Sequence, residues 1–459
     1  MRRPEGVTEG AACDLRAALA TCEGVLRLEG FGPDAAAAEL AAHHIGPPAR
    51  PRAGQEPVVL FPQAQGPALC FGLYGDEVRL RGWLPGLPQR IAPDTLAGFA
   101  PVAPVWEAAS DHMAEPPDLT ALPVPQVTPR DAGRYLSMGF VLAEAGEGAG
   151  GQVAVSAHRM LVLGPDRLGL WMLPGRALRQ MAEAAHAGGR DLAVTVNIGV
   201  PPALAIASAT STAHLPVPLD KLALAGGLAQ APLALARTAQ GLAYLARAEI
   251  VLEGVITAEQ VPEALPGAPL AGSMPEFLGY DGHGQPALHV LRLTGQRHRP
   301  EALFQSVIGP GREQSAILGL GGALALALAL PPALGVQDLR FAPAGGGMLL
   351  LYAALKPEAP RDLAATAQAM ARICPFLKTV IFVDDDVSVQ CDEDMLWAMT
   401  TRAQLAEDCH PLPGHRPMGM DPSQAPEWQA LRGGAGVFKS YVNATVPGPL
   451  RPAFRRSLS

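Results

Sequence analysis

Three short runs of the sequence contain residue types that can support chemistry. Residues 384–386 are three consecutive aspartates, and carboxylate oxygens are the ligands that hard divalent cations prefer. Residues 319–322 and 345–347 are rich in glycine, which lets a backbone approach a phosphate closely. The first glycine run lacks both the G-x-G-x-x-G spacing and a preceding strand, and the second fits a turn between strands. The acidic run could chelate a metal, and the alternative is that it serves only as scaffold.

The elements before these runs alternate between helical and strand patterns. A helix is expected at 14–19 with Asp14 as its N-cap, and another at 34–43. Strands are expected at 25–28, 58–61 and 69–73. This alternation predicts a small N-terminal α/β domain, followed by a proline-rich linker at 101–125.

The middle of the chain is dominated by strand patterns separated by glycine-rich turns. The strands are expected at 140–142, 153–158, 161–163, 168–172, 192–196, 249–256 and 288–293, with a helix at 176–187. After an apolar helix the pattern returns to α/β. Strands are predicted at 339–341, 348–352 and 379–383, and helices at 360–374 and 392–402.

Composition and charge exclude several classes of function. The chain has 459 residues, long enough for two or three domains, and 49% of them are hydrophobic. A net charge of −8 argues against nucleic acid or an anionic membrane as the main partner. The six cysteines are scattered without a C-x-x-C pair, which is typical of reduced thiols. Because no apolar segment follows the N-terminus, we expect a cytoplasmic protein.

The uncharged run 315–336 requires a separate test for membrane insertion. It approaches the roughly 20 apolar residues that a span needs. However, Pro331 and Pro332 interrupt it near the end, and glycines weaken its start. We therefore expect a buried helix and no membrane span.

Several stretches together resemble the UbiD family. They are residues 122–135 (LPVPQVTPRDAGRY), 197–203 (NIGVPPA), 220–226 (DKLALAG), 248–254 (AEIVLEG), 276–280 (EFLGY), 383–387 (VDDDV) and 397–402 (WAMTTR). No single stretch is decisive, but all occur in the expected order, and the similarity extends over about 14–421. Members of this family act with prenylated FMN on aromatic and α,β-unsaturated acids.

The resemblance implies an α+β fold with three domains. These are an N-terminal α/β domain (1–115), a central split β-barrel of the flavin-reductase type that binds the cofactor (116–312), and a C-terminal α/β domain (336–459). A connecting helix (313–335) joins the last two. The C-terminal domain resembles the family's dimerisation domain, so a homodimer or higher oligomer is expected. In the family the segment matching 384–386 is a structural strand end.

The resemblance also predicts where the cofactor phosphate is held. In the family a potassium ion and a divalent metal bind it, and the metal's ligands are an Asn, a His and a Glu. The Asn and Glu positions match Ala154 and Ala234 here, and residues 173–175 contain no His where one is expected. The family's Lys before Met418 matches Pro417, with Arg416 beside it. Alanine has no lone pair for a metal, so a divalent metal is not expected.

Prenylated FMN is therefore expected only with a changed mode of binding. His158, Ser156 and Arg416 are the predicted cofactor-binding residues. Other possible donors follow in residues 210–214. The alternative is that these are ordinary polar residues near strand ends.

The family's decarboxylation uses one arginine and two carboxylates. The arginine holds the substrate carboxylate in a forked contact, and one carboxylate transfers the proton that replaces carbon dioxide. Arg159 and Glu276 match two of these positions and are the predicted catalytic residues, whereas the other carboxylate is Ala271. Glu259 and Glu263 are candidates to replace it. The alternative is an inherited ion pair without a catalytic role.

Three functional hypotheses follow. The first is a decarboxylase or carboxylase for an aromatic or α,β-unsaturated acid with a remodelled cofactor site. The second is a non-catalytic paralogue that acts as a structural or regulatory subunit beside an active UbiD-type partner. The third keeps the pocket for another ligand, such as unmodified flavin. Fold alone does not separate them, because function depends on the site.

Overall fold

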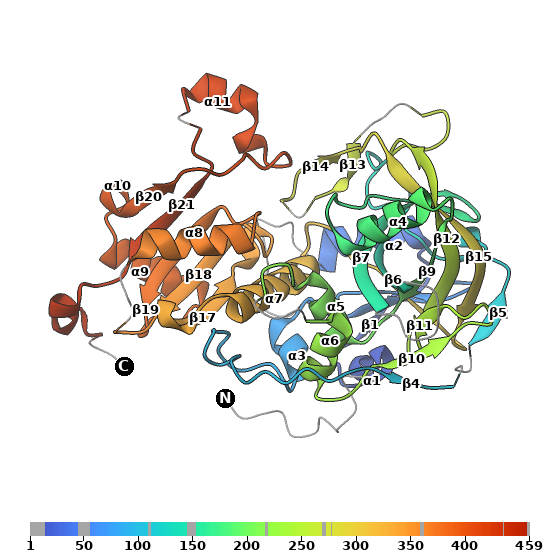
Figure 1. Cartoon of the computed structure of the whole chain (residues 1–459), viewed down its shortest axis with the longest axis horizontal. Helices are drawn as coiled ribbons and strands as arrows, with labels where there is room; N and C mark the ends of the chain where they lie inside the picture. Colours follow the sequence, from blue (N-terminus) through green and yellow to red (C-terminus); the bar gives the residue numbers. More distant parts are fainter. Residues whose placement is uncertain are drawn as a thin grey trace. The chain divides into compact units, whose positions relative to one another are not determined.

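The computed structural model describes residues 14–44, 56–108, 112–144, 153–215, 219–268, 272–276, 278–358, 362–434 and 436–456. The chain forms two compact units. The first comprises 1–86, 100–209 and 219–316, and the second comprises 87–99, 210–218 and 317–459. Figure 1 shows the elements of both.

The first unit is built around a closed barrel of six antiparallel strands. Their order is β12 (Ile250–Val261), β9 (Leu192–Ile198), β6 (Tyr135–Glu144), β7 (Val153–Gly164), β8 (Arg167–Leu170) and β15 (Leu288–His298). β15 also pairs with β12, which closes the barrel. This confirms the predicted central barrel. The strands predicted at 153–158 and 161–163 form one continuous strand, β7.

Aliphatic side chains fill the barrel. Met160, Val196, Leu252 and Leu291 are completely buried in one core cluster. α4 (Ala177–Ala187) contributes its apolar face to the same cluster. Each such side chain contributes about 1.5–3 kcal/mol by leaving water, so the barrel is a firm support for residues on its strands.

The N-terminal part of the first unit forms a small sheet. Its strands are β1 (Leu26–Arg27), β2 (Val59–Phe61), β3 (Ala68–Phe71) and β16 (Leu303–Gln305), and its helices are α1 (Leu15–Ala20), α2 (Pro33–Glu39) and α3 (Glu77–Gly82). Asp14 caps α1 as predicted, accepting a hydrogen bond from the backbone N–H of Arg16 at 2.7 Å. The predicted N-terminal α/β arrangement is confirmed.

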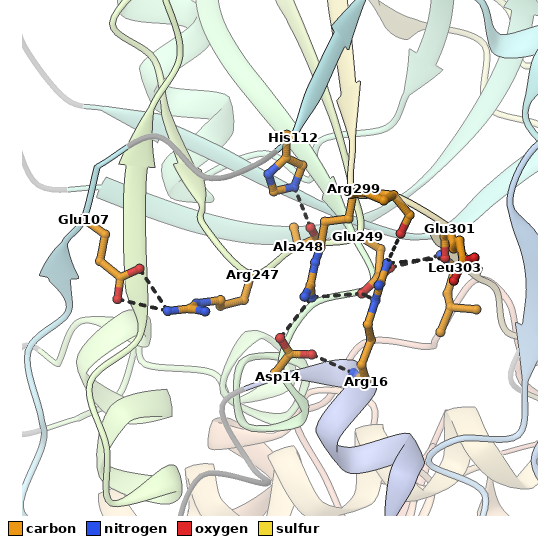
Figure 2. A network of polar contacts seen from close by, with 11 residues as sticks. Asp14, Arg16, Glu107, His112, Arg247, Ala248, Glu249, Arg299, Glu301 and Leu303 are labelled. Atoms are coloured by element: carbon orange, nitrogen blue, oxygen red, sulfur yellow. Dashed lines mark hydrogen bonds and ion pairs between the residues drawn. The ribbon is translucent and has the colours of Figure 1, made fainter.

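A buried carboxylate joins α1 to the barrel. Glu249, which directly precedes β12, accepts hydrogen bonds from the guanidinium of Arg16 at 2.7 and 2.8 Å and from that of Arg299 at 3.2 Å. It also accepts from the backbone N–H of Leu303 at 3.1 Å, and Asp14 pairs with Arg299 at 2.9 Å. Figure 2 shows this network. Glu249 of the family-like motif 248–254 therefore has a structural role.

The stretch 101–125 was predicted to be a linker, but it forms part of two sheets. β4 (Val105–Trp106) pairs with β10 (Ala234–Arg237), which also pairs with β11 (Ala243–Leu245). β5 (Met113–Glu115) pairs with β15 at the edge of the barrel sheet. Proline is compatible with extended chain, so a proline-rich segment can pair along a sheet edge through its other residues.

Two buried helices are among those of the first unit that escaped prediction. α5 (Pro202–Ala209) and α6 (Lys221–Ala229) pack against one another and against β7. Both helices are almost entirely buried, and their residues are apolar on nearly all sides. A helix without a polar face has no helical hydrophobic period for sequence patterns to detect.

The apolar run folds as α7 (Arg312–Ala329), whose first residues belong to the first unit and the rest to the second. It ends before Pro331, and a 3₁₀ turn (Pro332–Leu334) follows. The glycines at 319–322 lie inside this helix and not before it. A Cβ on Gly322 would lie 2.8 Å from the ring of Phe341, so this glycine allows close packing. No described helix combines the length and the apolarity that a membrane span requires.

The second unit contains a five-stranded sheet with helices. The strand order is β17 (Val336–Phe341), β18 (Leu350–Leu355), β19 (Thr379–Asp384), β21 (Lys439–Ala444) and β20 (Cys409–Leu412). α8 (Leu363–Ile373) and α9 (Asp392–Arg402) both contact β21 (Figure 1). Two shorter helices follow, α10 (Leu405–Asp408) and α11 (Pro426–Arg432). The predicted C-terminal α/β arrangement is confirmed.

Candidate active site

Arg159 lies on β7 opposite an irregularity in β6. Leu136 pairs with Met160 and Gly139 pairs with His158, so two residues of β6 stand opposite Arg159 alone. Such a bulge bends a strand locally and redirects neighbouring side chains. Bulges are frequent next to active sites. This bulge lies between two strands of the closed barrel.

The Arg159 guanidinium contacts two carboxylates that come from distant parts of the chain. It donates a hydrogen bond to Glu276 at 2.6 Å and another to Glu263 at 3.4 Å. The Arg159 side chain keeps 26% exposure, whereas Glu276 keeps 15% and Glu263 only 2%. The structure thus joins the two predicted catalytic residues. We call Arg159, Glu276 and Glu263 the arginine cluster.

A tight turn positions Glu276. β13 (Gly272–Pro275) and β14 (Asp281–His283) form a hairpin, and Glu276 is the first residue of its loop. The Glu276 N–H donates to the Tyr280 carbonyl at 2.9 Å, and the Gly279 N–H donates to the Glu276 carbonyl at 2.8 Å. Gly279 has φ +83°, which is why glycine suits this place in the motif 276–280.

Glu263 is the better placed of the two carboxylates that were candidates to replace the missing one. It follows β12 and accepts hydrogen bonds from the Tyr135 hydroxyl at 3.0 Å and the Gln285 N–H at 2.9 Å. Glu259 instead pairs with Arg167 at the surface. Ala271 lies outside the described residues.

The two carboxylates of the arginine cluster stabilise the positive charge of Arg159. Burial by itself lowers the pKa of Arg159, but Glu276 and Glu263 outweigh this effect, so the pKa is raised and the guanidinium stays charged. Burial and the nearby Glu263 carboxylate raise the pKa of Tyr135. The Tyr135 hydroxyl therefore stays protonated and donates a hydrogen bond to Glu263. A fixed cation between two carboxylates, partly open to solvent, is suited to binding a carboxylic acid and exchanging a proton with it.

His158 and Ser156 form a separate pair on β7. Ser156 Oγ lies 2.7 Å from His158 Nε2, and His158 Nδ1 lies 3.2 Å from the Trp171 carbonyl. Because a carbonyl only accepts, Nδ1 carries the proton and Nε2 accepts from the Ser156 hydroxyl. Burial lowers the pKa of His158 to about 4, so the imidazole is neutral near pH 7. Neither partner of His158 belongs to the arginine cluster.

Arg416 belongs to the second unit. It is exposed on the loop between β20 and the 3₁₀ turn Pro422–Gln424. Its predicted role in cofactor binding stays a prediction, as does that of His158 and Ser156.

The three aspartates at 384–386 are tied to arginines. Asp386 pairs with Arg402 at 2.6 Å, and Asp385 pairs with Arg451. Asp384 accepts a hydrogen bond from the Val446 N–H at 2.7 Å. Across the part of the chain that the structure describes, His, Cys, Asp and Glu side chains form no group of three or more suited to a metal ion. The aspartates thus connect the end of β19 to Arg402, Arg451 and the backbone of Val446.

Two residues near these sites were not singled out from the sequence. Tyr135 ends the motif 122–135 and contacts Glu263, and its place as the last motif residue was the available signal. Lys221 is the first residue of α6, and a single lysine at the start of an otherwise apolar helix was the signal there.

Comparisons with known proteins agree with this architecture. Residues 102–313 match the 3-octaprenyl-4-hydroxybenzoate carboxy-lyase Rift-related domain, and residues 317–438 match the corresponding C-terminal domain. The chain is 32% identical to gallate decarboxylase of Lactiplantibacillus plantarum over 381 residues, 80% of this chain and 76% of the relative.

Solved structures show the same fold over nearly the whole chain. The apo 3,4-dihydroxybenzoic acid decarboxylase of Enterobacter cloacae is 29% identical with a TM-score of 0.84, covering 97% of this chain and 96% of that one. The UbiD-class enzyme HmfF of Pelotomaculum thermopropionicum in complex with FMN is 26% identical with a TM-score of 0.78, covering 97% of both chains. The barrel, the two matched domains and the curated relative together establish that the chain belongs to the UbiD family of decarboxylases.

Proposed function

We propose that this chain provides a UbiD-type decarboxylase or carboxylase scaffold for an aromatic carboxylic acid. The observation that carries the proposal is the Arg159 guanidinium held at 2.6 Å from Glu276 and 3.4 Å from Glu263. The similarity to decarboxylases of gallate and 3,4-dihydroxybenzoate favours a hydroxylated benzoic acid as the substrate. An α,β-unsaturated acid is the other class that the family scaffold accommodates.

Each member of the arginine cluster has a role in this proposal. Arg159 binds the substrate carboxylate through its fork of N–H donors. The substrate carboxylate then replaces part of the contact between Arg159 and Glu276. Glu276, the more exposed carboxylate, exchanges the proton at the carbon that loses or gains carbon dioxide. Glu263 replaces the family carboxylate whose position matches Ala271, and it keeps Arg159 oriented from its buried side.

The residues present do not fit a flavin phosphate held through a divalent metal. Ala154 on β7 pairs with Ala143 on β6, and Ala234 begins β10, so both matching positions carry a methyl group. A methyl group supplies no lone pair for Mg²⁺ or Mn²⁺. We therefore propose a remodelled cofactor site, in which no divalent metal holds the phosphate of prenylated FMN.

One observation favours a second candidate. The charge of Arg159 is already balanced by two carboxylates of the protein itself, as in a structural ion pair. In a non-catalytic subunit beside an active UbiD-type partner, the ion pairs of Arg159 need only stabilise the fold.

The quaternary structure and compartment are part of the proposal. We infer a homodimer or higher oligomer assembled through the second unit, because that unit matches the family's C-terminal domain. The five described cysteines are unpaired thiols, which is typical of the cytoplasm. Light scattering of the purified chain measures the stoichiometry.

The decisive experiment is to co-express the chain with a flavin prenyltransferase and record its visible absorption spectrum and mass. Stoichiometric prenylated flavin supports the first candidate. Exchange of labelled bicarbonate into 3,4-dihydroxybenzoate or gallate then measures turnover, and Arg159→Ala and Glu276→Gln are each expected to reduce it at least a hundredfold. A colourless protein without flavin or exchange would overturn the catalytic proposal and support the subunit role.

A further inference from the structure

A lysine in the first unit has no anionic partner among the residues that the structure describes. Lys221, at the start of α6, donates a hydrogen bond from Nζ to the Ser208 carbonyl at 2.7 Å. Among the described residues no carboxylate lies within ion-pair distance of Lys221, and its neighbour Asp220 uses its own carboxylate to cap α6 through the Leu222 N–H. Burial, and to a smaller extent the positive charge of Arg176, lower the pKa of Lys221 to about 8.

The surroundings of Lys221 carry further unused donors. Ser208, at the end of α5, is 7% exposed, and its hydroxyl has no hydrogen-bond partner among the described residues. Arg176, just before α4, has an exposed side chain without a described ion pair. His158 on β7 is near enough for the charge of Lys221 to help lower the pKa of its imidazole, after the larger effect of burial.

Holding a half-buried cation beside a buried, unpaired hydroxyl is unfavourable unless a partner compensates them. The cost of a buried, unpartnered polar group is about 1–3 kcal/mol, and that of an unpaired charge is larger. A bound anion supplies the missing charge and accepts from both donors. Lysine serves as a compact point charge for phosphate groups, and the neighbouring arginine adds a second cation.

We propose that Lys221, Ser208 and Arg176 form a site that binds a phosphate group directly, without a divalent metal. The proposal rests on the proposed function in one respect: it names a means of holding the phosphate of a flavin mononucleotide where the metal ligands are missing. A free phosphate ion presents the same chemistry, and the experiment separates these two sources.

The test compares the wild-type chain with Lys221→Met by thermal unfolding and calorimetry. The probes are inorganic phosphate and FMN, each with and without EDTA. Lys356→Met is the matched control, because Lys356 already pairs with Asp94 at the surface. Without any probe, Lys221→Met is expected to raise the unfolding temperature above that of wild type, since it removes an uncompensated charge.

We expect phosphate to raise the unfolding temperature of wild type and Lys356→Met equally, with no effect of EDTA. Lys221→Met is expected to weaken phosphate binding at least tenfold, and Lys221→Arg to restore part of it, which also guards against misfolding of the Met variant. Binding of FMN with the same dependence on Lys221 identifies the cofactor as the source. Binding of phosphate alone supports the anion site and counts against the flavin-dependent function. Phosphate binding that EDTA abolishes, or that Lys221→Met retains, would overturn the proposal.

Discussion

The Arg159 guanidinium and the Glu276 carboxylate lie 2.6 Å apart although 117 residues separate them in the chain. One comes from a barrel strand and the other from a hairpin loop. A double-mutant cycle with Arg159→Ala and Glu276→Gln is expected to give a coupling energy of about 1–3 kcal/mol in the free energy of unfolding. Chemical denaturation measures it. Additive effects of the two substitutions would show that the pair does not form in solution.

Glu263 is expected to matter far more than Glu259. Glu263→Gln weakens the buried side of the Arg159 contact and is expected to cost about 2 kcal/mol of stability, together with at least a tenfold loss of any bicarbonate exchange. Glu259→Gln is the matched control, and it removes only a surface pair worth about 0–1 kcal/mol. Equal effects of the two substitutions would contradict the assignment of Glu263 to the arginine cluster.

The network of Figure 2 offers a second matched comparison. Glu249→Gln leaves Arg16 and Arg299 without their shared counter-charge at a site where the Glu249 side chain is fully buried. We expect a loss of about 3 kcal/mol in the free energy of unfolding, as for other broken buried pairs. Glu107→Gln, which affects only the exposed pair with Arg247, is expected to change stability by less than about 1 kcal/mol. Urea denaturation of both variants decides the matter.

Glu56 is expected to make stability depend on pH. It is 3% exposed, and its buried carboxylate oxygens lack a well-formed hydrogen bond among the described residues. Burial, followed by the charge of Glu313, raises the pKa of Glu56 to about 8, while Arg312 opposes the rise. The folded chain therefore holds a proton that the unfolded chain has lost, so stability falls as pH rises from about 4.5 to about 8.

Glu56→Gln is expected to remove this contribution to the pH dependence. At pH 8 the variant gains about 2–4 kcal/mol over wild type, because the unfavourable buried carboxylate is gone. At pH 4.5 the two proteins are expected to unfold at similar temperatures. The effect is measured by thermal unfolding at half-unit pH steps, and a constant difference across that range would refute the assigned cause.

Gly254 is expected to tolerate no side chain. It lies beside a register shift in β12, and an added Cβ would stand 2.5 Å from the carbonyl oxygen of Arg292 on β15. Gly254→Ala is expected to cost about 1–3 kcal/mol because the backbones of the two strands must separate. Gly164→Ala, where a Cβ meets nothing within 4 Å, is the control and is expected to be neutral. Denaturant midpoints of both variants provide the measurement.

The sequence by itself determined the family, the fold class and most elements. Helix caps such as Asp14 and strands such as β9 and β19 depend on neighbouring residues, so local patterns identify them. The match of Arg159 and Glu276 to a family pattern also needed only linear spacing. The almost entirely buried α5 and α6 escaped because they lack the hydrophobic period on which such patterns depend.

Only the tertiary structure decided which carboxylate stands beside Arg159. Glu259 and Glu263 lie four residues apart in the same segment, yet one reaches the surface and the other the arginine cluster. Their directions depend on the register of β12 against β15, which shifts between Ile256 and Gln260. Likewise, Lys221 meets Ser208 because α5 and α6 pack together. Contacts between segments distant in the chain arise from the packing of the whole barrel, and no local pattern encodes them.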